Sequence, residues 1–114
     1  MNIAVNARHM EVTDAMKDYV EERAQKLPRY YDNVNSVEVV LDKEGDFAFA
    51  EVVVGAVRKN TFVASSRDED MYAAIDQSFH KVIEQLRRHK EKVRDRQGPT
   101  HAEMADIERR RTSE

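Results

Sequence analysis

The sequence predicts an α+β fold, a two-layer sandwich in which two helices cover one face of a four-stranded, mostly antiparallel sheet. Four stretches alternate apolar and polar residues with the period of two that a half-buried strand requires, and two longer stretches repeat apolar residues every three or four positions. Their order along the 114 residues is β-α-β-β-β-α. Each predicted strand and helix has one apolar face, and two packed layers bury these faces together.

A strand and then a helix are predicted at the start of the chain. Residues 2–8 alternate apolar and polar side chains, which suits a strand with one buried face. A helix is expected over residues 13–27, where apolar side chains recur at helical spacing and Thr13 can act as the N-cap. Pro28 lacks a backbone N–H and disfavours helix in the residue before it, so the chain should turn over residues 28–33.

Three further strands are predicted, over residues 36–42, 47–54 and 61–67. Each carries its apolar side chains mainly on one face. The polar segment 43–46 joins the first two of these strands as a hairpin turn, in which Gly45 can adopt a positive φ.

The second helix has the strongest local pattern in the sequence and is predicted over residues 69–94. Its apolar seam follows an acidic start and consists of Tyr72, Ile75, Phe79, Val82, Leu86 and Val93. Residues 97–114 hold only Met104 and Ile107 as large apolar side chains, too few to offset the entropy lost on ordering the segment. We therefore expect one folded domain over residues 1–96 and a flexible polar tail over residues 97–114.

The composition excludes several classes of protein. The chain has no cysteine, so disulfide frameworks, thiolate zinc sites and cysteine nucleophiles are ruled out. No stretch approaches a membrane span or a signal peptide, and we expect a soluble, cytoplasmic protein. With three glycines and no phosphate-binding loop motif, the sequence offers little material for a nucleotide site.

A catalytic or metal site is not expected. His80 and Glu84 share a helical face and form a two-ligand fragment of a metal site, but nothing supplies a third or fourth ligand at a recognisable spacing. A solvated helix face is the more economical interpretation of that pair. We therefore expect no enzyme activity, no cofactor, no metal and no small-molecule substrate.

Charge is distributed unevenly along the chain, although the formal net charge is only −3. Residues 80–96 hold seven basic side chains against three acidic ones. Helical spacing places three of them in one stripe and two beside it, and this basic group consists of Lys81, Arg88 and Lys92 with Arg87 and Lys90. Arg23 and Lys26 lie near the end of the first predicted helix, so two parallel helices would present their basic ends together.

Two interpretations of these charges remain open at this point. A cationic stripe suits the phosphate backbone of a nucleic acid. Basic residues in the last turns of a helix also solvate it and complement its dipole, and Asp18, Glu21 and Glu22 lie among the basic residues of the first helix. The tyrosines are candidate platforms for stacked bases, although core packing is favoured for Tyr19 and Tyr72 because both lie in apolar stripes.

Three segments of the sequence resemble one family of bacterial proteins. They are RHMEVTDAMKDYVEERAQKL, SVEVVLD and DEDMYAAIDQSFHKVIEQLRRHKEK. The chain is similar over roughly residues 1–96 to the ribosome hibernation-promoting and ribosome-associated inhibitor proteins, also called sigma-54 modulation proteins. The DMYAAID segment followed by the QLRRHKEK run is the most specific part of the likeness.

The resemblance implies a function and a set of contacts. Members of this family bind the small ribosomal subunit in the channel between head and body, overlap the messenger RNA and transfer RNA sites, and silence translation in stress or stationary phase. Their fold is akin to double-stranded-RNA-binding domains. The family's rRNA-binding positions carry over to Lys81, Arg87, Arg88, Lys90, Lys92, Arg23 and Lys26, with Arg8 as a further contact. Pro28 departs from the charged residue that the family pattern leads us to expect.

The resemblance also leaves choices open. Long members add a C-terminal dimerisation domain, whereas residues 97–114 are too few and too polar to form one, so we expect a short form. Short forms either promote ribosome dimers or oppose them, and the sequence does not choose between these effects. The alternative function is a protein-interaction module that modulates transcription through contact between its basic helix and an acidic protein.

Overall fold

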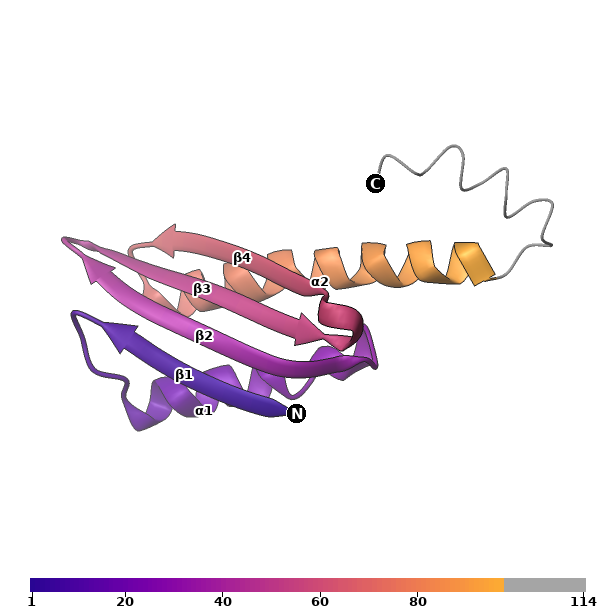
Figure 1. Cartoon of the computed structure of the whole chain (residues 1–114). Coiled ribbons are helices and arrows are strands. Elements are labelled where there is room, and N and C mark those ends of the chain that lie inside the picture. The colour runs from indigo at the N-terminus through magenta and orange to yellow at the C-terminus, as the bar shows by residue number, and fades with distance from the viewer. Residues whose placement is uncertain (98–114) are drawn as a thin grey trace.

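The structure, a computed structural model, describes the backbone of residues 1–97 and the side chains of residues 1–92. Two helices lie on one face of a four-stranded sheet, as predicted (Figure 1). The elements are β1 (Asn2–Arg8), α1 (Asp14–Ala24), β2 (Val34–Glu44), β3 (Phe47–Ala56), β4 (Thr61–Asp68) and α2 (Met71–Gln97). Short 3₁₀ turns occupy Leu27–Arg29 and Val57–Lys59.

The sheet is mixed and keeps its strands in sequence order, β1-β2-β3-β4. β1 pairs with β2 in parallel, because α1 carries the chain back across the sheet between them. The pairs β2–β3 and β3–β4 are antiparallel. The predicted α+β class and the mostly antiparallel sheet are therefore confirmed.

The core lies between the sheet and the helices. One row of the register runs across all four strands through Val5, Val39, Val52 and Ala64. The last three of these side chains are buried, and Val5 packs against them. From the helical side, α2 contributes the buried seam residues Ile75, Phe79, Val82 and Leu86, which confirms their predicted position. The side chain of Val93 lies outside the described set.

Both helix starts are defined by side-chain caps. Thr13 Oγ1 accepts a hydrogen bond from the backbone N–H of Met16 at 3.1 Å, as the sequence predicts for an N-cap. α2 begins at Met71 rather than at residue 69, because Asp70 serves as its cap. The Asp70 carboxylate accepts from the Tyr72 N–H at 3.2 Å, and its backbone carbonyl accepts from Ala74 at 3.0 Å.

The first helix is shorter than predicted. α1 ends at Ala24 instead of residue 27, and the chain tightens into the 3₁₀ turn that contains Pro28. Leu27 is fully buried in this turn. The turn brings that side chain into the core, and the chain does not need a further α-helical turn to bury it.

The hairpin between β2 and β3 is tighter than predicted. Its turn consists of Gly45 and Asp46 alone, and the strands pair as far as Glu44 and Phe47. Gly45 has φ +61°, which an L-residue adopts only with strain. β2 also begins earlier than predicted, at Val34, with an irregularity in its pairing between Val34 and Ser36.

The outer edge of β4 is covered by side chains of α2. Lys81 Nζ donates a hydrogen bond to the carbonyl oxygen of Ser65 at 2.8 Å. Gln85 Nε2 donates to the carbonyl oxygen of Val63 at 2.9 Å. Two backbone acceptors of this edge strand are thereby satisfied, whereas β1 forms the opposite edge of the sheet.

The predicted flexible tail, residues 97–114, lies outside the described residues except for Gln97 at the end of α2. Across the described part of the chain, neither helix combines the length and the apolar character needed to cross a membrane.

Candidate nucleic-acid interface

The two helices run side by side in the same direction. Contacts progress along α2 as the chain passes from α1 into the segment after its 3₁₀ turn: Tyr19 of α1 meets Asp76, and then Tyr30 and Tyr31 meet Arg87 and His89. Parallel helices point their C-terminal dipole ends, which favour positive charge, in the same direction. α2 continues to Gln97, well past the end of α1 at Ala24. The expected parallel arrangement of the two helices is therefore present (Figure 1). Arg23, however, lies beside Asp76 in the first part of α2 and not beside the basic residues that follow it.

The basic side chains of α2 form two rows. The β4-side row consists of Lys81, Arg88 and Lys92, which follow one another at helical spacing on the flank of α2 from which Lys81 reaches β4. The α1-side row consists of Arg87 and Lys90, and the Arg87 guanidinium lies 5.2 Å from the ring centre of Tyr30. All five side chains are exposed. The structure thus divides the predicted basic group between the two flanks of the helix.

Several of these cations have no protein partner. Within residues 1–92, the side chains of Arg88, Lys90 and Lys26 are exposed and make no hydrogen bond or ion pair. Arg87 reaches Glu84 at 3.4 Å, a contact that water and salt screen at an exposed site. Cations without protein partners can bind phosphate oxygens without first breaking an internal interaction.

Arg8 is separated from the other predicted contacts. It alternates with Ile3, Val5 and Ala7, which pack toward the core, so it lies on the face of the sheet that the helices leave open. Its neighbour in the register is Asp42. The structure does not bring Arg8 together with the basic rows of α2.

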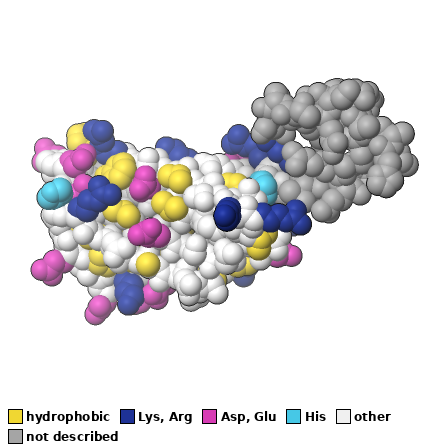
Figure 2. All heavy atoms as spheres, in the orientation of Figure 1, with side chains coloured by type: hydrophobic (Ala, Val, Ile, Leu, Met, Phe, Trp, Pro, Cys, Tyr) yellow, Lys and Arg dark blue, Asp and Glu magenta, His cyan; other side chains and the backbone are white. Residues whose placement is uncertain are grey.

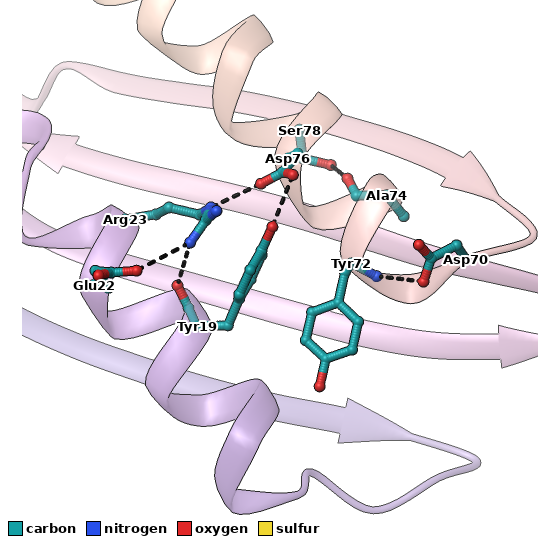
Figure 3. A network of polar contacts seen from close by, with 8 residues as sticks. All are labelled: Tyr19, Glu22, Arg23, Asp70, Tyr72, Ala74, Asp76 and Ser78. Carbon is teal, nitrogen blue, oxygen red and sulfur yellow. Dashed lines mark hydrogen bonds and ion pairs between the residues drawn. The ribbon is translucent and has the colours of Figure 1, made fainter.

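Arg23, a predicted contact on α1, is held in a network of polar contacts with α2 (Figure 3). Its Nε donates to Asp76 Oδ1 of α2 at 2.7 Å. Its Nη1 donates to the backbone carbonyl of Tyr19 at 3.3 Å and reaches Glu22 at the same distance. The guanidinium carbon lies 3.4 Å from the ring centre of Tyr19. Arg23 is therefore more constrained than Arg88 and Lys90 of α2, whose side chains are exposed.

Tyr19 completes this network at the second carboxylate oxygen of Asp76. Its hydroxyl donates to Asp76 Oδ2 at 2.8 Å, and its ring meets that of Tyr72 edge to face at 4.8 Å. Burial and the hydrogen bond to the Asp76 carboxylate raise the pKa of the Tyr19 phenol. Tyr19 thus packs against the core, as predicted, but it also has a polar role between the helices that the apolar pattern alone does not predict. The sequence feature that indicates this polar role is an acidic residue, Asp76, beside the apolar seam of α2.

Other features of the sequence do not gather into a site. Tyr31 is buried against His89, with ring centres 5.0 Å apart, and so presents no open face to a base. In the part of the chain that the structure describes, no three His, Asp or Glu side chains come together as metal ligands would.

The chain thus combines a mixed four-stranded sheet with two parallel helices, the longer of which carries exposed basic residues. Residues 3–94 match the family model described as Sigma 54 modulation protein / S30EA ribosomal protein. The chain belongs to this family, which confirms the resemblance found in the sequence.

Individual relatives within this family carry more specific names. The chain is 39% identical to the ribosome hibernation promoting factor of Azotobacter vinelandii over 85% of its own length and 90% of the relative's. It is 33% identical to the protein of the same name in Escherichia coli K12, over 82% and 98% of the two chains.

Solved structures agree with this assignment. The crystal structure of the N-terminal domain of Thermus thermophilus Protein Y matches with a TM-score of 0.72 and 37% identity, covering 78% of this chain and 99% of that one. A ribosomal subunit interface protein from Coxiella burnetii matches with a TM-score of 0.73 at 19% identity, covering 79% and 98%, which supports the fold.

Proposed function

We propose that this protein is a ribosome hibernation factor that binds the small ribosomal subunit through its rRNA and blocks the messenger RNA and transfer RNA sites in stress or stationary phase. The observation that carries the proposal is the likeness to ribosome hibernation promoting factors over more than four-fifths of the chain. The exposed basic rows of α2 supply a physical means of binding.

The charge distribution favours the helical side of the molecule as the rRNA-binding side. An exposed cation that meets a phosphate releases condensed counterions, so binding gains free energy at low salt. The open face of the sheet is different, because acidic, basic and apolar side chains are intermixed there (Figure 2). Glu38 and Glu51 lie on that face, opposite Val53 and Ser65 in the register. A protein of net charge −3 therefore needs its basic rows to direct RNA to one side.

The proposed inhibition requires no catalysis. A protein that occupies the messenger and transfer RNA sites acts by exclusion, so its effect depends on affinity and occupancy alone. Such a protein acts where ribosomes are, in the cytoplasm.

Sedimentation of cell extract tests the proposal. We expect the protein to travel with ribosomal particles at low salt and to leave them at high salt, because its contacts are electrostatic. With purified subunits, the small subunit should retain the protein and the large subunit should not. A protein that stays in the soluble fraction at every salt concentration would contradict the proposal.

The same experiment addresses the alternative function. A module that modulates transcription would bind an acidic protein and would not sediment with ribosomal particles. The names of the curated relatives do not favour this alternative, because they refer to ribosome hibernation.

A further inference from the structure

The polar contact between α1 and α2 centres on the carboxylate of Asp76. Asp76 accepts hydrogen bonds on both of its oxygens, from Arg23 Nε at 2.7 Å and from the Tyr19 hydroxyl at 2.8 Å. Both donors belong to α1, and the acceptor belongs to α2 (Figure 3). A charge-assisted pair of this geometry fixes orientation as well as distance.

The surroundings of Arg23 disfavour a phosphate ligand. Two carboxylates, of Asp76 and Glu22, lie within ion-pair distance of this one guanidinium, at 2.7 and 3.3 Å. One face of the guanidinium is covered by the Tyr19 ring at 3.4 Å. The cluster of Arg23, Asp76 and Glu22 carries more negative than positive charge, and the Arg23 side chain is only 29% exposed.

We propose that Arg23 is a positioning residue for rRNA binding and that Asp76 is the group through which it acts. This inference rests on the proposed function. With Tyr19, the pair holds α1 at a fixed place along α2. It thereby sets the separation between Lys26, near the end of α1, and the α1-side row of Arg87 and Lys90. Phosphates along an RNA strand have regular spacing, so cations on two helices bind together only when the helices are held in register.

Positioning and direct contact predict different salt dependences. A residue that contacts phosphate contributes about one unit to the slope of log affinity against log salt, and its removal flattens that slope. A residue that only positions others changes the affinity and leaves the slope unchanged. Arg88 is the matched reference, because it is an exposed arginine without a protein partner among residues 1–92.

The experiment measures the binding of each variant to purified small ribosomal subunits at several potassium chloride concentrations. We expect Arg23→Gln to weaken binding about tenfold, or about 1.4 kcal/mol, with the wild-type slope. Arg88→Gln should flatten the slope by about one unit. Arg23→Lys should be as weak as Arg23→Gln, because an ammonium lacks the planar fork that bonds Asp76 while stacking on Tyr19.

Asp76→Asn gives the sharpest test. Removal of an anion from an RNA-binding protein raises affinity by general electrostatics. If Asp76 positions α1, the variant instead binds more weakly, with the wild-type slope. Tyr19→Phe removes only one hydroxyl and should weaken binding in the same sense, which keeps the test available if Asp76→Asn does not fold.

Two results would overturn the inference. One is wild-type binding by Arg23→Lys together with a flattened slope for Arg23→Gln, which would make Arg23 a phosphate contact. The other is tighter binding by Asp76→Asn. Failure of the proposed function is distinguishable from both, because the wild-type protein would then not bind small subunits at all.

Discussion

His9 Nδ1 and Asp42 Oδ1 lie 2.9 Å apart and join the residue after β1 to the last paired residue of β2 in the β1–β2 ladder. The two side chains differ in environment, since His9 is 75% exposed and Asp42 only 8%. Asp42 Oδ1 also accepts from the Lys43 N–H at 2.7 Å. His9 adopts a left-handed backbone conformation, φ 59°, to place its ring there. The hydrogen bond from His9 lowers the pKa of the Asp42 carboxyl, and the bond from Lys43 contributes in the same direction.

This lowered pKa makes stability depend on pH in the acid range. A carboxyl with a folded-state pKa below its unfolded value of about 3.9 stabilises the protein above that pH and loses the contribution as pH falls through the folded pKa. We expect the free energy of unfolding to drop below about pH 4, and Asp42→Asn to show a shallower drop. Urea unfolding across pH measures both. Asp46→Asn, in the exposed hairpin turn, is the control; an equal change in both variants would contradict the assignment.

Phe79 tests the apolar seam of α2. The side chain is 3% exposed within the core, and truncation of a buried phenylalanine costs about 3–5 kcal/mol. Phe79→Ala should therefore unfold at a much lower urea concentration, because a small domain has only about 5–15 kcal/mol in total. Phe47→Ala is the matched control, since Phe47 is 42% exposed. Equal midpoints for the two variants would show that the seam is not the core.

Ser78 is a buried polar residue that connects α2 to the sheet. Its hydroxyl lies 2.9 Å from the carbonyl oxygens of both Ala50 and Ala74. We expect Ser78→Ala to lose about 1 kcal/mol with the hydrogen bond. Ser78→Val should lose more, about 1–3 kcal/mol, because the site is fully packed. Chemical unfolding gives the order, and a valine variant as stable as wild type would mean that α2 can move away from β3.

The basic rows of α2 can be tested without disturbing the fold. The double variant Arg87→Ala, Arg88→Ala should weaken binding to the small subunit and flatten its salt slope by about two units. Inhibition of translation in a purified system should weaken in parallel. The melting temperature should change little, because an exposed charge contributes about 0–1 kcal/mol.

A charge-matched control accompanies that variant. Lys17→Ala, Lys43→Ala also removes two exposed cations, but at the hairpin end of the molecule. It should bind and inhibit like the wild type. If both double variants lose the same affinity, net charge rather than the α2 surface governs binding.

The elements that were predicted well are those in which one signal is repeated many times. The seam from Ile75 to Leu86 recurs over several turns, so one exception could not change the assignment. Boundaries depended on single residues and were less accurate. Glu44 pairs with Phe47 at the end of the hairpin although it is charged, because a side chain at a strand end can be solvated while its backbone still pairs. α1 ended early because Leu27 could be buried through a 3₁₀ turn.

The site was predicted only in part for a related reason. The number and spacing of basic residues predict the exposed cations of α2, because all of these residues belong to one helix. The pairing of Arg23 with Asp76 spans 53 positions in sequence, and it is set by how two helices pack. No local pattern encodes that separation. From the sequence alone, Arg23 and Arg88 are therefore both predicted to be exposed cations, although their surroundings in the structure differ.

The covering of β4 by Lys81 and Gln85 has a consequence for self-association. An edge strand with open backbone groups is a template on which further chains can pair and aggregate. Here a second chain would first have to displace the side chains bonded to Ser65 and Val63. Lys81 is also a proposed phosphate ligand, so binding to RNA would compete with its hydrogen bond to the backbone of β4. Loss of Lys81 should therefore increase aggregation of the free protein, a defect separate from any loss of affinity for the ribosome.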